Sequence, residues 1–134
     1  MGEIATETNC WRWPDELDAL SAAPENHRLL LENERVRVLQ THIPVGATTP
    51  VHTHRWPSIE YVQSGSHLVR RSEDGKVELD TRAAGAPLRA SEVTWAEPFP
   101  PHSAENVGEV EIRVLMIELK ETRAATSGTA SCPF

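Results

Sequence analysis

Cysteine, aromatic residues and long apolar runs are all scarce in this sequence. Its two cysteines, Cys10 and Cys132, are too few for a disulfide scaffold, so we expect two reduced thiols. No apolar run approaches the roughly 18 residues of a membrane span, and the N-terminus lacks the apolar core of a signal peptide. We therefore expect no membrane association and a cytoplasmic location.

Basic residues are also in short supply. The 134 residues include 13 Lys and Arg against 20 Asp and Glu, which gives a net charge of −7. Proteins that bind nucleic acid or anionic membranes cluster positive charge against phosphate groups, whereas the basic residues here are scattered. The composition therefore argues against a nucleic-acid partner, and the length suits a single domain.

The sequence does contain a series of short strand patterns. A helix is expected only at 14–22, where Pro14 precedes a cluster of acidic residues. From residue 28, apolar segments of strand length are separated by Gly, Pro and polar turns such as Asp74-Gly75. These patterns predict an all-β fold, a small antiparallel β-barrel or sandwich preceded by a short helix. The expected division is 1–27 for an N-terminal arm and short helix, 28–121 for the barrel and 122–134 for a C-terminal tail.

A pair of histidines stands at the head of one predicted strand, in the stretch "PVHTHRWPSIEYVQSG". Residues i and i+2 of a strand point to the same face, so His52 and His54 can direct both imidazoles at one metal ion. On its own this pattern is also typical of solvent-exposed loop histidines. A third histidine, His102, follows the proline-rich segment "EPFPP" far downstream.

The residues around these histidines resemble the two motifs of the cupin superfamily. The matching residues are Gly46, His52, His54 and Gly65 in the first motif, and His102 and Asn106 in the second. The resemblance covers roughly residues 30 to 120. It implies a single-domain jelly-roll barrel in which His52, His54 and His102 bind one divalent metal ion, and it favours a homodimer.

One position departs from the cupin pattern. Ser58 stands where the family has a glutamate ligand, and serine is a poor ligand for a divalent ion. On an unbulged strand, Glu60 would face the same interior as Ser58 and Val62. Glu60 could then reach the metal, act as a catalytic acid or base, or form a buried ion pair with an arginine such as Arg70 or Arg113.

Three histidines remain enough to bind a metal. The arrangement is similar to that of thiol dioxygenases and the diketone-cleaving dioxygenase, so iron is the expected ion, although Zn, Mn, Ni, Co and Cu also suit imidazole. The leading hypothesis is an Fe(II)-type dioxygenase acting on a small organic substrate. The alternatives are a non-redox lyase or isomerase that uses Glu60 for proton transfer, and a cupin that binds a small molecule without turnover.

Further residues are candidates for the wall of a substrate pocket, with ordinary core packing as the alternative. They are Ser58, Val62, Trp56, Trp95, Phe99 and Met116. His27 follows "PEN" in a predicted loop, so we expect it at the surface.

Overall fold

A computed structural model of the chain describes residues 11–120. The predicted tail 122–134, the first ten residues of the arm and both cysteines lie outside the described residues. The described strands are β1 (His27–Glu32), β2 (Val36–Ile43), β3 (His52–His54), β4 (Ser58–Ser64), β5 (Leu68–Ser72), β6 (Val77–Asp80), β7 (Val93–Ala96), β8 (Phe99–Asn106) and β9 (Ile112–Leu119).

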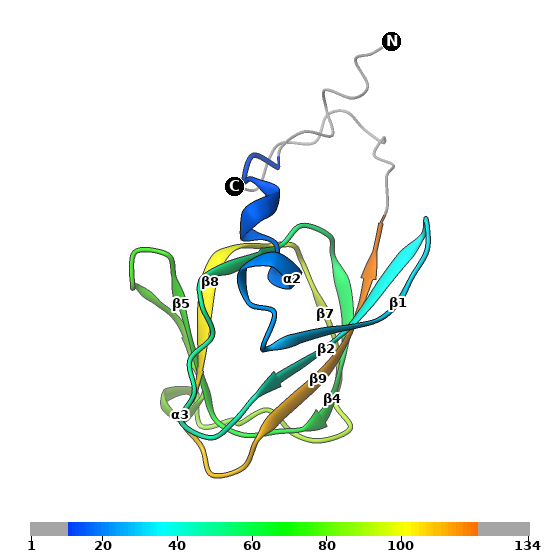
Figure 1. Ribbon diagram of the computed structural model, residues 1–134. Helices are drawn as coiled ribbons and strands as arrows, with labels where there is room; N and C mark the ends of the chain where they lie inside the picture. Colours follow the sequence, from blue (N-terminus) through cyan, green and yellow to red (C-terminus); the bar gives the residue numbers. More distant parts are fainter. Residues whose placement is uncertain (1–10, 121–134) are drawn as a thin grey trace, which may run out of the picture.

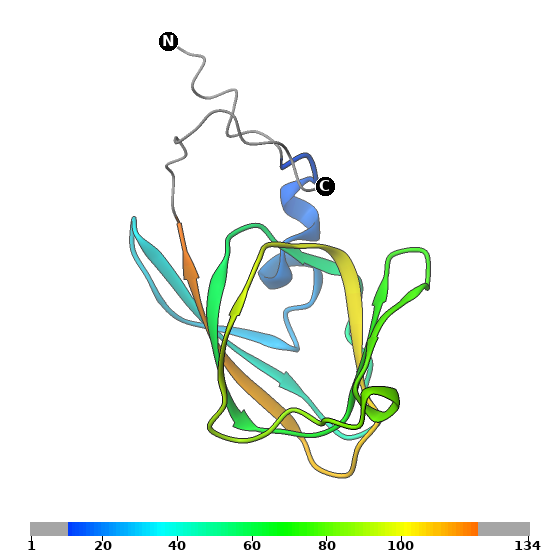
Figure 2. The same ribbon diagram turned by 180° about the vertical axis from the view of Figure 1, so that it is seen from behind.

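The strands form two antiparallel sheets, with strand orders β1-β2-β9-β4-β7 and β3-β8-β5-β6. The sheets curve around a common interior, as seen from both sides in Figures 1 and 2. Among the described strands no ladder joins one sheet to the other, so the barrel consists of two facing sheets and is not a closed cylinder. The predicted all-β barrel fold is confirmed.

The centre of the larger sheet determines what the interior contains. Strands β2 and β9 pair along their whole lengths, and burial alternates residue by residue on both. The period of two follows from the strand pleat, which sends successive side chains to opposite faces. The inward-facing residues are Arg37, Leu39, Thr41 and Ile43 on β2, and Ile112, Val114, Met116 and Glu118 on β9. The interior is therefore charged at one end of these strands and aliphatic at the other.

The predicted helix at 14–22 is divided into two short pieces. A 3-10 turn, η1 (Asp15–Leu17), is followed by α2 (Ala19–Ala22), and Asp18 between them has an extended ψ of 145°. The Asp18 carboxylate caps α2 by accepting a hydrogen bond from Leu20 N at 3.0 Å. This segment lies across one end of the barrel, in front in Figure 1 and behind in Figure 2. A further short helix, α3 (Thr81–Ala84), follows β6.

Two residues of the cupin-like motifs have structural roles. The Gly65 backbone passes so close to its neighbour that a Cβ atom there would lie 2.0 Å from the carbonyl oxygen of Leu88. The buried Asn106 amide donates to the carbonyl oxygens of Ile43 and Val110, both at 2.9 Å. These motif residues hold loops together at the aliphatic end of the barrel.

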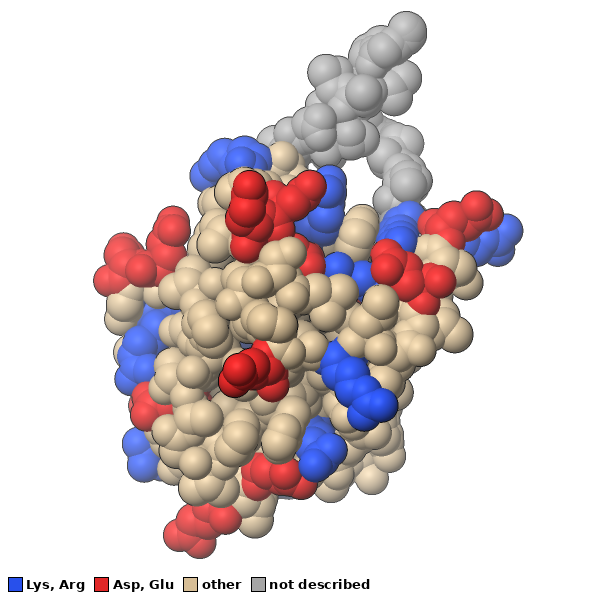
Figure 3. Space-filling view, in the orientation of Figure 1, with Lys and Arg blue, Asp and Glu red and all other residues tan. Residues whose placement is uncertain are grey.

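Charged side chains of both signs are interspersed on the face of the molecule that carries α2 (Figure 3). None of the helices in residues 11–120 is long and apolar enough to cross a membrane.

Candidate metal centre

Four histidines meet inside the barrel at the end covered by α2. His27 begins β1, His52 and His54 come from β3, and His102 comes from β8. Ring nitrogens of His27, His52 and His54 lie within 4.8 Å of one another. The His102 ring centroid lies 4.4 Å from that of His52, its cross-strand partner, and 5.8 Å from that of His54. The four residues form what we call the histidine cluster.

Each imidazole of the histidine cluster is held by a hydrogen bond at Nδ1. Three of these nitrogens face backbone carbonyl oxygens: Ala23 O for His27 at 3.0 Å, Pro50 O for His52 at 2.8 Å, and Pro100 O for His102 at 2.8 Å. His54 Nδ1 faces Glu118 Oε2 at 2.8 Å. A carbonyl or carboxylate oxygen only accepts, so Nδ1 carries the proton and Nε2 keeps its lone pair. This is the arrangement typical of histidines that bind a metal through Nε2.

Burial keeps the histidine cluster uncharged. It lowers the pKa of His27 to about 3, and the nearby His54 and His52 add to the effect. Burial also lowers the pKa values of His52, His54 and His102, the last two well below the ordinary value. Metal ions bind the neutral imidazole, so the cluster is in its binding form at neutral pH without losing protons first.

A buried ion-pair network supports the histidine cluster from behind. Glu118 is fully buried and accepts from Arg37 Nε at 2.6 Å with the oxygen that does not face His54. Arg37 in turn donates from both Nη atoms to the two carboxylate oxygens of Asp18, each at 2.9 Å. The network thus joins His54 to the N-cap of α2, and every carboxylate oxygen in it has a partner.

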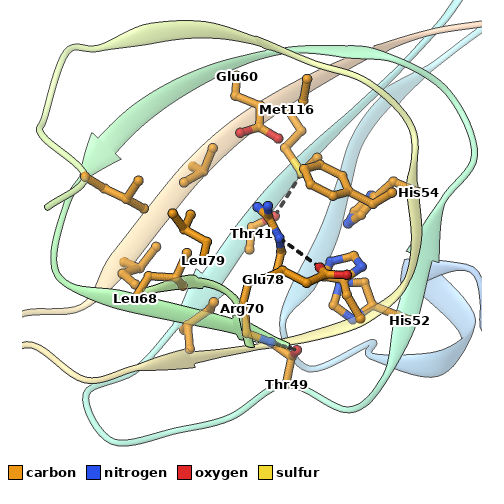
Figure 4. A pocket seen from close by; sticks show the side chains of 18 of the residues that line it. Thr41, Thr49, His52, His54, Glu60, Leu68, Arg70, Glu78, Leu79 and Met116 are labelled. Atoms are coloured by element: carbon orange, nitrogen blue, oxygen red, sulfur yellow. Dashed lines mark hydrogen bonds and ion pairs between the residues drawn. The ribbon is translucent and has the colours of Figure 1, made fainter. Parts of the chain in front are cut away.

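The histidine cluster opens into a cavity of about 730 Å³, within the range of small-molecule sites. Thr41, Glu60, Arg70 and Met116 line its middle, as Figure 4 shows. Its far end is formed by aliphatic side chains: Ile43, Leu68, Leu79, Leu88, Ile112 and Val114. The cavity is therefore polar at the histidine cluster and apolar at the opposite end.

Glu60 projects from β4 into this cavity, on the side of Met116 (Figure 4). Burial raises the pKa of Glu60, and the charge of Arg70 opposes the shift without cancelling it. Within residues 11–120 no hydrogen bond or ion pair engages the Glu60 carboxylate. The proposed alternative of a buried ion pair is therefore not formed: Arg113 pairs with Glu111 at 2.8 Å, and Arg70 with Glu78 at 3.4 Å.

The predicted site residues are distributed as follows. His52, His54 and His102 converge with Glu60, Trp95, Phe99 and Met116 around the cavity. Ser58 and Val62 face inward on β4 but are covered by their neighbours, and neither lines the cavity. Trp56 borders a separate hollow beside Arg37, because β3 has ended before it and the chain has turned outward.

Two site residues escaped the sequence analysis. The expectation that His27 lies at the surface is wrong: its side chain is buried at the start of β1 and belongs to the histidine cluster. Only the fold brings it there, because the rest of β1 is exposed and gives no inward pattern. The sequence did indicate that Glu118 faces the interior. On a strand every second residue faces the same side, and Glu118 continues the inward series Ile112, Val114 and Met116, which is otherwise apolar.

Comparison by sequence finds no relative: no family model matches the chain, and no curated protein does. Solved structures do match its fold. A cupin domain from Bordetella pertussis Tohama I is 20% identical, with 71% of this chain and 92% of that chain covered and a TM-score of 0.59. An RmlC-like cupin family protein from Methanocaldococcus jannaschii is 11% identical, with 69% and 77% covered and a TM-score of 0.51.

The second structure is described as a double-stranded β-helix, the arrangement of two facing antiparallel sheets found here. At these identities the likeness establishes the architecture, and the chemistry has to be argued from the residues of this chain. This chain therefore has the cupin fold.

Proposed function

We propose that this protein is a metal-dependent enzyme that acts on a small organic molecule in the barrel cavity. The observation that carries the proposal is the histidine cluster: buried neutral imidazoles with Nδ1 occupied and Nε2 free, at the inner end of a cavity of ligand size. His27, His52 and His54 would hold the ion, with His102 as a fourth ligand.

The donor set fits one divalent transition-metal ion per chain. Imidazole nitrogen suits Fe, Zn, Ni, Co, Cu and Mn, and the all-nitrogen cluster does not favour the hard ions that prefer oxygen ligands. Four donors need not fill the coordination sphere of such an ion. When bound, the ion supplies Lewis-acid polarisation of a substrate oxygen.

Within this proposal, Glu60 transfers the proton. Its carboxylate lies in the cavity without a hydrogen-bond partner among the described residues, so it is available to a substrate. Burial raises the pKa of Glu60, and a raised pKa makes a carboxylate a better acceptor of a substrate proton. The aliphatic far end of the cavity would hold the substrate body and exclude water. This arrangement supports a non-redox lyase or isomerase.

An Fe(II)-type dioxygenase is the second candidate. It is supported by the uncharged, all-histidine donor set and by the apolar lining, which suits a reaction that has to be kept away from water. The two candidates differ in their requirement for oxygen. Activity that survives without oxygen in the zinc-loaded protein and is lost in Glu60→Gln favours proton transfer. Oxygen uptake that requires iron favours the dioxygenase.

The first experiment measures metal per chain in protein purified without a histidine tag. We expect about one ion per chain in the wild type, and loss of most of it in His54→Ala and His27→Ala. His42→Ala is the matched control, because His42 pairs with Glu111 outside the cluster. A wild type that takes up no metal after reconstitution would refute the proposal and would leave a cupin that only binds small molecules.

We also propose that the protein is a homodimer. Both edge strands of the larger sheet expose large apolar side chains, among them Leu31 on β1 and Val93 on β7, 51% and 63% exposed. Uncovered edges of this kind favour pairing with another chain. A monomeric mass in solution would overturn this proposal.

A further inference from the structure

Arg70 is the one arginine or lysine among the described residues that line the cavity. It projects inward from β5 on the same face as Leu68, whereas Arg71 beside it pairs with Glu105 at 2.9 Å on the other face. In Figure 4 the Arg70 side chain reaches the middle of the cavity, with Glu60 to one side and His52 and His54 to the other. A guanidinium group at this position lies within reach of anything bound there.

The contacts of Arg70 leave most of its donors unused. Its only hydrogen bond or ion pair within residues 11–120 is a long one, from Nε to Glu78 Oε1 at 3.4 Å. Its guanidinium carbon lies 5.1 Å from the ring centroid of Phe99, which holds the group over an aromatic face. Both Nη atoms remain available, and they form the planar fork that binds a carboxylate through two parallel hydrogen bonds.

Phe99 also places this guanidinium beside the histidine cluster. The Phe99 ring centroid lies 5.0 Å from that of His102 and 5.8 Å from that of His54. One aromatic ring therefore contacts both the proposed metal ligands and the Arg70 guanidinium. A molecule that binds Arg70 would also lie next to the metal position.

The carboxylates of the cavity leave both Nη atoms of Arg70 without a hydrogen bond to residues 11–120. Glu97 lies at the exposed rim and accepts from Trp95 Nε1 at 2.6 Å, and the side chain of Glu78 is 39% exposed. Glu60 is the inner carboxylate; burial raises its pKa, and it forms no hydrogen bond or ion pair with Arg70. The interior thus offers an anion one guanidinium group with both Nη atoms available, next to the proposed metal.

We infer that the ligand of this cavity is an organic carboxylate with an apolar body: the carboxylate binds the Nη atoms of Arg70, and the body packs on the aliphatic far end. This inference rests on the proposed function, because it takes the cavity beside the histidine cluster as the substrate site. It goes beyond that function by assigning the class of substrate.

The test compares two probes with the same apolar body, 3-phenylpropanoate, which carries a carboxylate, and 3-phenylpropanol, which carries an uncharged hydroxyl. Calorimetry measures their binding to zinc-loaded full-length protein, and metal content is measured on the same samples. We expect the acid to bind the wild type more tightly than the alcohol does. Arg70→Gln should weaken acid binding by roughly tenfold to a hundredfold, as expected for lost charged hydrogen bonds, and leave alcohol binding unchanged.

Two further variants control this result. Arg71→Gln removes the same charge from the outer face of the same strand and should leave acid binding unchanged. Glu78→Gln removes the competing partner of Arg70 and should tighten acid binding by a few-fold, so the inference stays testable even if Arg70→Gln does not fold.

The inference is overturned if the wild type binds neither probe, if acid and alcohol bind alike, or if acid binding is the same in Arg70→Gln and the wild type. Metal content separates this inference from the proposed function. If the protein holds metal but binds the acid and the alcohol equally well, the carboxylate inference is refuted and the proposed metal-dependent function stands. If the protein takes up no metal but binds the acid in a way that depends on Arg70, the carboxylate inference is supported and the proposed metal-dependent function is refuted.

Discussion

Two carboxylates face the barrel interior from neighbouring strands, and they differ in their partners. Both oxygens of Glu118 are engaged, one by His54 and the other by Arg37. Glu60, on β4 opposite Met116, lies in the cavity with no hydrogen bond or ion pair to residues 11–120. Glu118 is fully buried and needs its partners, because an unpaired buried charge costs stability. Glu60 is only half-buried and faces the cavity, so its carboxylate is available to a bound molecule.

The same difference separates the two polar parts of the interior. In the histidine cluster every Nδ1 has an acceptor, so the rings are fixed before any metal arrives. In the middle of the cavity, Glu60 and the Nη atoms of Arg70 point into open space. The supporting groups are held by several short hydrogen bonds, whereas the groups proposed to meet the substrate have only the long one from Arg70 to Glu78 within residues 11–120.

The largest expected effect comes from removing the satisfied carboxylate. Glu118→Ala leaves the buried Arg37 with only Asp18 and releases the His54 ring, so we expect the free energy of unfolding to fall by about 3–5 kcal/mol. Urea denaturation measures this loss. Glu105→Ala, which breaks the more exposed pair with Arg71, is the control and should cost less than about 1 kcal/mol. Equal losses would contradict the role given to Glu118.

The next effect concerns the metal itself. An ion that binds only the folded chain stabilises it by about 3–4 kcal/mol when free metal exceeds Kd by 100-fold to 1,000-fold. Chelation should therefore lower the melting temperature of the wild type. His27→Ala should show little response to chelation, and His42→Ala should respond like the wild type. A full response in His27→Ala would exclude His27 as a ligand.

A smaller effect, of opposite sign, is expected at the open carboxylate. The folded-state pKa of Glu60 is raised above its unfolded value of about 4.5, so the stability that Glu60 contributes is complete below that pH and is lost as pH rises through the folded pKa. Glu60→Gln avoids this loss and should be more stable than the wild type at neutral pH.

Urea denaturation at about pH 4 and about pH 7.5 checks the sign, because the advantage of Glu60→Gln should be present only at the higher pH. Glu73→Gln on the exposed β5–β6 hairpin is the control and should change stability by less than about 0.5 kcal/mol at either pH. An advantage of Glu60→Gln that persists in acid would show that ionisation is not its cause.

The smallest effect is expected at Ser58, which stands where the cupin pattern has a glutamate ligand. Ser58 is buried opposite Glu118 on the neighbouring strand, outside the cavity lining. Ser58→Ala should leave metal content unchanged and alter the free energy of unfolding by less than about 1 kcal/mol. Loss of metal in this variant would show that its hydroxyl contributes to the site.

The sequence contained enough information for the fold and for part of the site. Alternating burial on β2 and β9 and the turn at Asp74-Gly75 are local patterns, and the spacing of His52 and His54 follows from strand geometry alone. Which residues of the two sheets come together does not follow from local sequence patterns. His27 joins the cluster because β1, at the edge of one sheet, lies close to β3 and β8, which belong to the other sheet. No spacing rule predicts such a contact.

The predicted helix at 14–22 is divided into two pieces for a related reason. The apolar and acidic residues of 14–22 fit a helix, but Asp18 is drawn out of helical geometry by Arg37, its ion-pair partner on β2. The tertiary contact outweighs the local preference, which is worth only tenths of a kcal/mol per residue.

The location of the histidine cluster in the fold also determines when, during folding, a metal site can form. Its members come from residues 27 to 102, and the carboxylate that fixes His54 comes from β9, at the end of the described chain. Contacts of such long sequence separation form late, after the intervening loops have closed. Uptake of the proposed metal would therefore report that the whole barrel has been assembled. A chain still lacking its last strand holds all four histidines but not the framework that aligns them.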